Sequence, residues 1–361
     1  MRMDELDYVL PPERIATLPA EPRDASRLMV VHADSSVEHR HFFDLIEYLR
    51  AGDLVVVNNT RVLPAKLLFR RRSGAAIPGL FVRELAQGLW EVMLRTRGKV
   101  KEGEILESGA VEIVLQRRAG DGLWHVQLQG PAVVQQASEV LSRIGHVPLP
   151  PYIEKQRRAS GGEEELAADR AWYQTVYAHQ TGGRSVAAPT AGLHFTPGLL
   201  TRLEAMGVRR VSVELEVGMG TFLPVETETL EEHRMHVERY RVPAETIRAI
   251  RQVRAGGGRI VVVGTTAVRT LETCALQILP ETPAADVEGE TGLKIAPGFK
   301  FQLTDVLITN FHLPRSTLMA LVGAFLGGDG VARLKALYAE AIEKAYRFYS
   351  YGDAMVIMNR I

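Results

Sequence analysis

The feature that most restricts the possible folds is a change of pattern early in the chain. From about residue 66 to residue 130 the sequence has no helical period and consists of short apolar segments separated by glycine-rich turns. Short strands at this spacing predict a small barrel or sandwich, and Gly120-Asp121-Gly122 is a strong hairpin signal. The expected strands lie near residues 66–72, 79–85, 89–94, 111–118 and 123–129.

Strands and helices alternate on both sides of this region. The apolar run Leu54-Val55-Val56-Val57 is typical of a strand that is buried on both faces. The alternation predicts an α/β fold, with a mainly parallel mixed sheet covered by helices. Further strands are expected near 26–32, 37–42, 208–217, 259–264 and 305–309, and helices near 43–49, 138–144, 244–255, 267–279, 317–326 and 332–348.

The strand-rich region therefore interrupts an α/β pattern that resumes after a run of prolines at 148–151. We expect a discontinuous α/β domain made of residues 1–65 and 148–361, and an inserted small β-barrel domain of residues 66–147. The length of 361 residues agrees with two domains, because single cores rarely grow beyond about 250–300 residues. The polar segments 160–168 and 280–291 are expected to be surface excursions.

Composition excludes several classes of protein. Basic and acidic residues both number 43, so no global field attracts nucleic acid or an acidic membrane. The single cysteine, Cys274, rules out an intramolecular disulfide, lies in an apolar segment and suits a reducing compartment. The acidic N-terminus does not resemble a signal peptide, and no stretch reaches the roughly 20 apolar residues of a membrane span. We expect a cytoplasmic protein without a membrane partner.

Positive charge is nevertheless concentrated in and after the barrel region. Such residues can hold RNA phosphates, an electrostatic contact that carries no sequence information. The alternative is a solvated barrel face, but several basic runs in one small domain favour RNA. The candidate RNA-binding residues are Arg70, Arg71, Arg72, Arg95, Arg97, Lys99, Arg157 and Arg158.

Two loops each present one histidine before a helix start. The stretch 185–197 is expected to run from a short strand through a loop of small residues to His194, and Thr196-Pro197 then opens a helix. Residues 308–317 repeat this order with His312. Free N–H groups at a helix start commonly face ligands, although each histidine alone is equally compatible with a packed loop. Together the two loops predict one pocket, with Thr190, Gly192 and Asn310 among its residues.

Other polar residues follow predicted strands, where ligands gather in open α/β sheets. They are also ordinary turn formers, so a structural role is the alternative. Glu214 and Glu216 share one strand face just before a glycine-rich loop, and we favour Glu216 because it is nearer to that loop. Thr265 or Thr266 can cap the helix that follows Gly264. Tyr351 and Asp353 come from an aromatic segment near the C-terminus that offers a surface for stacking a base, with core packing as the alternative. The strand-end candidates are Asn58, Asn59, Arg61, Gly218, Gly220, Thr221, Thr265 and Thr266.

Signals for a metal or a nucleotide cofactor are weak. His233 and His236 have a spacing that occurs in metal sites, but no third ligand accompanies them. Gly264 stands alone, without a dinucleotide or Walker pattern. Arg269 and Glu272, three apart on a predicted helix, are expected to form a local ion pair.

Taken together, these stretches resemble the S-adenosylmethionine:tRNA ribosyltransferase-isomerase family of queuosine biosynthesis. The resemblance covers nearly the whole chain. It departs from the family at Ala171-Trp172, Val237 and Ala267, to which we assign no catalytic role. The matching blocks are residues 23–27, 57–62, 185–197, 216–224, 264–266, 309–317 and 350–354.

The resemblance implies that the chain transfers the ribosyl moiety of S-adenosylmethionine to the aminomethyl group of 7-aminomethyl-7-deazaguanine at the wobble position of tRNA. The sugar is isomerised, giving epoxyqueuosine-tRNA, adenine and methionine. S-adenosylmethionine is then a co-substrate, no metal or prosthetic group is needed, and the protein acts as a monomer. The family fold joins an α/β domain to an inserted β-barrel.

On this reading His194 and His312 share acid and base duties, because imidazole titrates near neutral pH. Glu216 and Asp353 bind hydroxyls or the amine, and the loop Gly218–Thr221 contacts the donor. Two alternatives remain: a non-catalytic RNA-binding protein with a basic barrel, and an S-adenosylmethionine methyltransferase. The second is disfavoured because the chain lacks an early glycine-rich loop between a strand and a helix.

Overall fold

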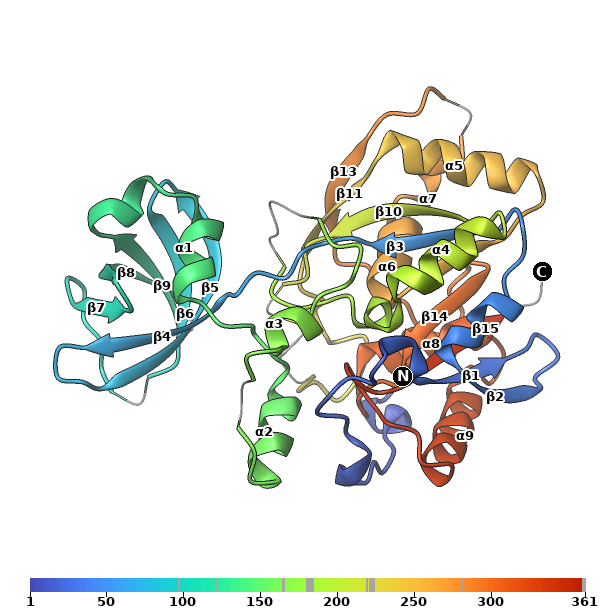
Figure 1. The fold of residues 1–361 in the computed structure, drawn as a ribbon, viewed down its shortest axis with the longest axis horizontal. Helices are drawn as coiled ribbons and strands as arrows, with labels where there is room; N and C mark the ends of the chain where they lie inside the picture. The colour runs from blue at the N-terminus through green and yellow to red at the C-terminus, as the bar shows by residue number, and fades with distance from the viewer. Residues whose placement is uncertain are drawn as a thin grey trace.

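The computed structural model describes residues 1–96, 98–120, 122–163, 166–179, 185–218, 220, 225–280 and 282–358. The described part consists of a large α/β unit and a small barrel, joined by two chain crossings (Figure 1). The α/β fold with an inserted barrel is therefore confirmed.

The α/β unit is built around one mixed sheet. Among the described residues, nine strands pair in the order β13-β11-β10-β3-β12-β14-β15-β1-β2. The central strands β10, β3, β12 and β14 are mutually parallel, whereas β11, β13 and β15 add antiparallel pairings. These strands are β1 Arg27–Val31, β2 Val37–His41, β3 Leu54–Asn58, β10 Arg209–Leu215, β11 Glu238–Val242, β12 Ile260–Val263, β13 Val287–Thr291, β14 Val306–Asn310 and β15 Ala354–Met358.

Apolar side chains bury both faces of this sheet. Leu54 and Val56 of β3 belong to one core, together with residues of α5, α6, α8 and α9. Val55 and Val57 belong to the opposite core with residues of α4. This explains the unbroken apolar run, since successive strand residues point to opposite faces. The helices are α4 Pro197–Ala205, α5 Ala244–Ala255, α6 Thr265–Thr273, α7 Ala275–Ile278, α8 Thr317–Leu326 and α9 Gly330–Glu343.

The barrel closes in the strand order β4-β5-β6-β9-β8-β7. Its interior is filled by large apolar residues such as Phe69, Trp90 and Ile113. The strands are β4 Lys66–Arg71, β5 Ala76–Ala86, β6 Leu89–Leu94, β7 Ile105–Ser108, β8 Val111–Gly120 and β9 Leu123–Leu128, and the chain returns through the helices α1 Ala137–Ile144, α2 Pro151–Ala159 and α3 Asp169–Trp172. The strand β7 was not expected, because it is only four residues long.

Several local expectations were wrong. Residues 185–188 form no ladder strand, since only Ser185 makes an isolated bridge to Val62. The segment 280–291 contains β13, which pairs with β11. The helix expected over 267–279 breaks at the buried Cys274 into α6 and α7, and the helix expected over 43–49 is a 3-10 helix, Phe42–Glu47.

No single helix in the described ranges is both long and apolar enough to cross a bilayer. The helices α8 and α9 meet the criteria only as a pair bent by 105°, and both bury apolar residues in the core of the α/β unit.

Candidate functional site

The segments that carry the candidate site residues meet at one end of the sheet, where the parallel strands terminate. The strands β3, β10, β12 and β14 are parallel, so their carboxyl ends lie together. The chain leaves this end of β3 toward the barrel, and the edge therefore faces the barrel side of the molecule (Figure 1). Hydrogen bonds between the loops then join segments that are far apart in the sequence.

Asn58 connects the first two of these strands. Its Nδ2 donates to the Leu215 carbonyl (3.2 Å) and to Thr266 Oγ1 (3.3 Å). Its Oδ1 accepts from the backbone N–H groups of Thr60 and Leu215, both at 3.1 Å. Because the buried amide is fully engaged within the protein, Asn58 holds the loops rather than offering a free group to a ligand.

A second chain of hydrogen bonds runs from this loop to the end of β10. Thr60 Oγ1 and Ser185 Oγ are 2.7 Å apart. Ser185 Oγ accepts from the backbone N–H of Val217 at 2.9 Å. The residues before Gly218 are thus tied to both the loop after β3 and the start of the stretch 185–197.

His194 occupies the centre of a buried network. Its Nε2 lies 3.1 Å from Nδ2 of Asn310, whose Oδ1 accepts from Thr190 Oγ1 at 2.9 Å. Since an amide nitrogen can only donate, Nε2 is the acceptor, and Nδ1 carries the proton toward Ser26 Oγ at 2.8 Å. The imidazole stacks on Phe42 with a centroid distance of 5.0 Å. The structure therefore brings His194, Asn310 and Thr190 together, as the sequence predicted.

Burial keeps this imidazole neutral. The pKa of His194 is lowered to about 3, mainly by desolvation and further by Arg347 and Arg23. The side chain is oriented at both nitrogens and is poorly suited to hold a proton near neutral pH.

His312 has a similar environment on the neighbouring loop. Its Nε2 lies 2.8 Å from Thr309 Oγ1, and its backbone N–H donates to the Tyr338 hydroxyl at 2.8 Å. Tyr8 donates to its carbonyl at 2.5 Å. Burial lowers the pKa of His312 to about 4. Asn310, two residues earlier, links this loop to His194.

The remaining acidic and aromatic candidates differ in exposure. Asp353 is buried, and its carboxylate accepts from the backbone N–H groups of Arg27 (2.9 Å) and Arg347 (2.7 Å). Burial raises the pKa of this carboxyl group. Tyr351 is buried against Tyr173, with ring centroids 6.0 Å apart. It therefore offers no surface for stacking a base, contrary to the sequence interpretation. Glu216 is half-buried just after β10.

Glycines allow two unusually close approaches at this edge. A Cβ at Gly192 would lie 1.9 Å from the Tyr177 hydroxyl, and a Cβ at Gly220 would lie 2.0 Å from the ring of His236. These glycines accommodate side chains of the protein itself. The backbone N–H of Gly218 donates to Glu238 Oε1 at 3.2 Å. Thr221, the last residue of the predicted donor loop, lies outside the described residues.

The start of α6 differs from the prediction. Gly264, with φ at +87°, is the N-cap, and Thr265 and Thr266 are the first helical residues. Neither threonine caps the helix; Thr266 instead accepts from Asn58. Arg269 pairs with Glu238 at 2.5 Å, while Glu272 accepts from residues 302–304. The expected local ion pair between Arg269 and Glu272 is wrong.

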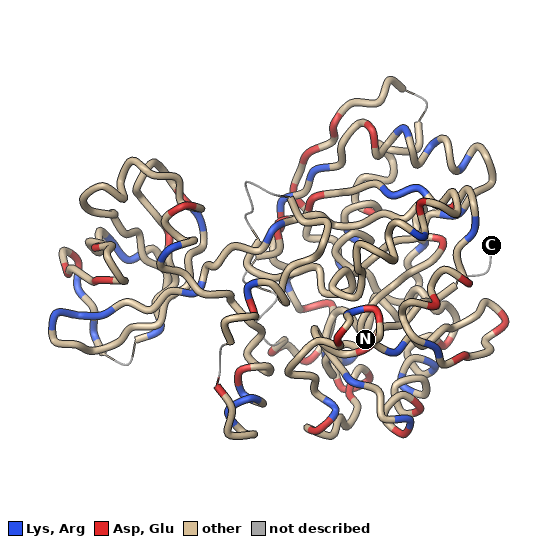
Figure 2. Tube along the Cα trace, in the orientation of Figure 1, with Lys and Arg blue, Asp and Glu red and all other residues tan. Residues whose placement is uncertain are grey.

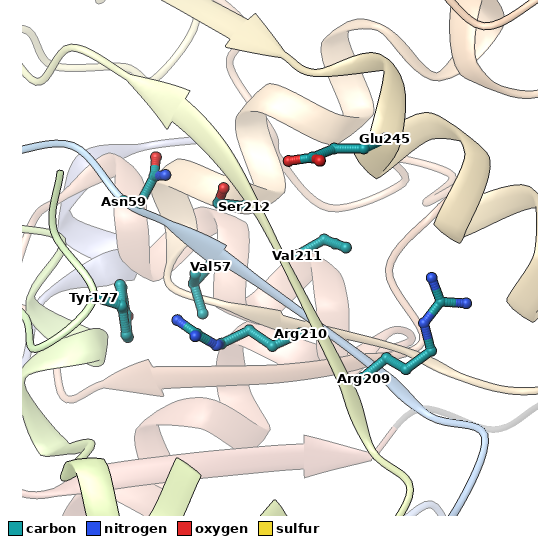
Figure 3. Close-up of a pocket in the computed structure, with 8 residues that line it drawn as sticks. All are labelled: Val57, Asn59, Tyr177, Arg209, Arg210, Val211, Ser212 and Glu245. Carbon is teal, nitrogen blue, oxygen red and sulfur yellow. The ribbon is translucent and has the colours of Figure 1, made fainter. Parts of the chain in front are cut away.

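Two adjoining cavities lie beside this network, along β10. Their volumes are about 350 and 330 Å³. Asn59, Ser212 and Glu245 line both of them, Tyr177 and Arg210 line the first (Figure 3), and His179 and Glu214 line the second. Of these residues, Asn59 is a candidate predicted from the sequence, and Glu214 is the strand neighbour that was less favoured than Glu216. Arg61, at the rim of the same region, is exposed and donates to the His179 carbonyl at 3.2 Å.

The candidate RNA-binding residues divide by exposure. Arg157 is buried and pairs with Asp169 at 2.6 and 2.8 Å, so its charge is not offered at the surface. Arg71 is half-buried and lies 2.7 Å from Glu104. Arg97 falls outside the described residues. Figure 2 shows basic residues at the barrel end that is remote from the sheet. The exposed candidates are Arg70, Arg72, Arg95, Lys99 and Arg158.

Comparison with known proteins identifies the family. The model of the family described as "Queuosine biosynthesis protein" matches residues 3–357. A Thermotoga maritima protein named S-adenosylmethionine:tRNA ribosyltransferase-isomerase is 48% identical over 360 residues, covering 99% of this chain and all of the relative. A protein of the same name from Symbiobacterium thermophilum is 47% identical over 370 residues, again covering 99% of this chain and all of the relative.

A solved structure supports the same assignment. The crystal structure of S-adenosylmethionine tRNA ribosyltransferase from Thermotoga maritima matches with a TM-score of 0.54 and 39% identity, covering 98% of this chain and 100% of that one. The chain belongs to the queuosine biosynthesis protein family, and it is an enzyme.

Proposed function

We propose that this enzyme transfers and isomerises the ribosyl moiety of S-adenosylmethionine onto the aminomethyl group of 7-aminomethyl-7-deazaguanine at the tRNA wobble position. The products are epoxyqueuosine-tRNA, adenine and methionine. The observation that carries the proposal is that the blocks 57–62, 185–197, 264–266 and 309–317 of the family resemblance are hydrogen-bonded to one another at one sheet edge.

The reaction needs three proton movements: removal beside the sulfonium, delivery to departing adenine, and loss from the attacking ammonium. We assign the first two to His194 and His312, with Glu216 and Asp353 near the sugar or amine. Burial lowers the pKa values of these rings to about 3 and about 4, so each is neutral near neutral pH and, once protonated, is a strong acid that can deliver its proton to the departing adenine. Asn58, Thr266 and Asn310 hold the loops of the site in register.

The barrel supplies the electrostatic surface for tRNA in this proposal. Its exposed arginines and lysine are suited to phosphate contacts, which position an RNA without reading its sequence. The anticodon loop would then enter from the barrel side, which the carboxyl ends of the strands face (Figure 1). We further propose that residues 66–147 form this unit and that the protein works as a monomer without a prosthetic group.

The test is a single-turnover assay with S-adenosylmethionine and tRNA that carries the aminomethyl base. Release of adenine and methionine is expected. S-adenosylhomocysteine would instead indicate a methyltransferase, and no small product would indicate an RNA-binding module. If His194→Ala and His312→Ala both kept rates near that of the wild type, the assigned histidine roles would be wrong.

A further inference from the structure

The two cavities lie beside the part of β10 that is not fully paired with β11. Among the described residues, β11 pairs with β10 at Glu214 and Leu215, and the N–H of Glu216 donates to the Arg239 carbonyl at 2.9 Å, so no described strand pairs with the first half of β10 on that side. The cavities extend along this open half from Asn59 to Arg209. We call the surface lined by Val57, Asn59, Tyr177, His179, Ser212 and Glu214 the β10 groove.

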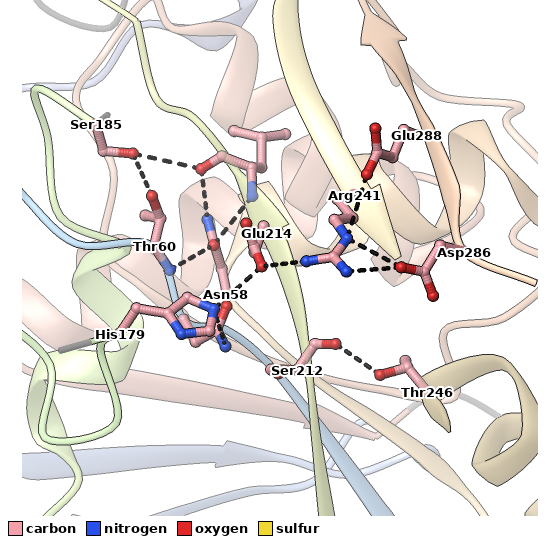
Figure 4. Close-up of polar contacts among 12 residues, drawn as sticks. Asn58, Thr60, His179, Ser185, Ser212, Glu214, Arg241, Thr246, Asp286 and Glu288 are labelled. Carbon is pink, nitrogen blue, oxygen red and sulfur yellow. Dashed lines mark hydrogen bonds and ion pairs between the residues drawn. The ribbon is translucent and has the colours of Figure 1, made fainter. Parts of the chain in front are cut away.

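A histidine and a carboxylate are paired in the β10 groove. His179 Nε2 lies 3.1 Å from Glu214 Oε1, and these side chains are 48% and 31% exposed. A carboxylate oxygen at this distance requires the proton on Nε2, which leaves the lone pair on Nδ1. No hydrogen bond from the described residues reaches Nδ1. Glu214 in turn contacts Arg241, which pairs with Asp286 at 2.6 Å (Figure 4).

Asn59 lacks a partner at one side of its amide. The residue is 8% exposed, and its Oδ1 is buried without a hydrogen-bond partner in the described part of the chain. Its Nδ2 lies 3.0 Å from His179 Nε2. If the amide is turned so that its oxygen meets the Nε2 proton, the amino group takes the unpartnered position instead. A proton on Nε2 requires this turned orientation, because two donors would otherwise face each other, and it leaves the amino group of Asn59 for a ligand.

The other walls of the β10 groove suit a flat, partly apolar molecule. The half-buried Val211 and Tyr177 line it above the fully buried Val57, and the guanidinium of Arg210 lies 5.9 Å from the centre of the Tyr177 ring. Arg209 and Arg210 are exposed at its far end, where phosphates can be held. A base can stack on an aromatic ring while an amide contacts its edge.

We propose that the β10 groove binds the amine-bearing base of the RNA substrate and that His179 is the general base that deprotonates its ammonium group. This inference rests on the proposed function, which supplies the identity of the base. The amine must be neutral to attack the sugar. Unlike His194 and His312, whose rings are buried, His179 lies in an open groove where a nucleotide can reach it.

The proton transfer balances within these groups. One N–H bond of the ammonium breaks and its electron pair stays on the amine nitrogen, while a new N–H bond forms at Nδ1 of His179. The carboxylate of Glu214 stabilises the resulting imidazolium, which then releases its proton to solvent. The ionisable groups that face His179 or line the same cavity are Arg61, Glu214, Arg241, Glu245, Arg248 and Asp286.

The first test compares the pH dependence of variants under single-turnover conditions at saturating S-adenosylmethionine. His179→Gln should lower the rate by about 10²–10⁴ and abolish the acid limb of the pH–rate profile. Glu214→Gln should lower the rate by a smaller factor than His179→Gln, because a neutral amide stabilises the imidazolium formed in the step less than a carboxylate does. His41→Gln is the matched control, since His41 is an exposed histidine on β2, at the opposite edge of the sheet. It should keep both rate and profile.

The second test measures binding without turnover, using the free base 7-aminomethyl-7-deazaguanine and S-adenosylmethionine separately. Asn59→Ala should weaken binding of the base roughly tenfold, because a buried polar contact is lost, and should leave S-adenosylmethionine affinity unchanged. If the wild type bound the base through Asn59 but released no adenine, the proposed function would fail while the base site stood.

Two results would overturn the inference. One is a His179→Gln protein that folds, reacts within about threefold of the wild-type rate and retains the acid limb of the pH–rate profile. Such a small loss would not fit a general base. The other is an Asn59→Ala protein that loses affinity for S-adenosylmethionine but not for the base.

Discussion

His194 and His179 lie in segments near the same sheet edge but have opposite surroundings. His194 is buried, bonded at both nitrogens and neutral because desolvation lowers its pKa to about 3. His179 is 48% exposed and lies against a carboxylate. The difference shows that burial, and not the position on a loop at this end of the sheet, decides whether a histidine ring is fixed by the protein or accessible to a ligand. Burial fixes the ring of His194 within the protein, whereas the exposed ring of His179 can be reached by a nucleotide.

The largest expected effect is the loss of stability when a buried ion pair is broken, compared with the loss when an exposed ion pair beside the β10 groove is broken. Arg157→Ala should lower the free energy of unfolding by about 3–5 kcal/mol, because it leaves Asp169 charged and buried. Arg241→Ala removes a pair that is 44% and 41% exposed, and should cost less than about 1 kcal/mol. Denaturant unfolding of both variants measures the contrast, and equal losses would contradict it.

The next prediction concerns the close packing of Gly192 against Tyr177. Gly192→Ala places a methyl group 1.9 Å from the Tyr177 hydroxyl, and overpacking of this kind costs about 1–3 kcal/mol. Gly198→Ala is the control, because a Cβ there meets nothing within 4 Å. The melting temperature should fall for Gly192→Ala and stay unchanged or rise for Gly198→Ala. An unchanged Gly192→Ala protein would show that Tyr177 moves freely.

A smaller effect concerns acid stability. An unfolded histidine has a pKa of about 6.5, whereas burial lowers the pKa of His312 to about 4. Below pH of about 6.5 the unfolded chain therefore binds more protons, and stability present above that pH is lost as pH falls toward 4. Each such histidine contributes a slope of at most about 1.4 kcal/mol per pH unit.

The measurement is the free energy of unfolding of His312→Gln and of the wild type at several pH values in that range. The variant should show the shallower slope, and the difference between the two proteins cancels groups such as Asp353 that both contain. A parallel pair of curves would mean that His312 is not held neutral.

The smallest effect is at the barrel surface. Replacing the exposed Arg70 and Arg72 by alanine should leave stability nearly unchanged and should reduce the salt dependence of tRNA binding by roughly one phosphate contact per arginine. The same treatment of Arg239, which is 62% exposed on β11, is the control. An unaltered salt dependence of tRNA binding would show that the hairpin of β4 and β5 is not part of the RNA-binding surface.

Much of the fold was predictable because burial leaves a pattern in the sequence. The central strand β3 is a run of apolar residues, and α5 and α8 match the predicted helices 244–255 and 317–326 residue for residue. The missed strands lack that pattern. Three of the five residues of β11 are charged, and β13 contains a glycine between two glutamates. Their place in the sheet depends on partners that are distant in the sequence.

The candidate site was predictable in the same limited sense. Asn310 ends the parallel strand β14, so its place at this end of the sheet followed from its position in the chain, whereas Thr190 and His194 reach it from a segment that forms no ladder strand. Tyr351 was misread as a surface ring, because aromatic composition does not tell a buried ring from an exposed one. His179 belongs to no recognisable motif, and only folding places it beside Glu214 and Asn59.

The sequence by itself determined the α/β fold, the inserted barrel and the edge where the strand-end loops gather, because hydrophobic periodicity and turn residues are local properties. Only the tertiary structure decided which histidine is buried, which carboxylate pairs with an exposed histidine and where a cavity forms. Those properties depend on desolvation and on contacts between distant segments, such as the bond of Asn310 to His194 and the pairing of His179 with Glu214.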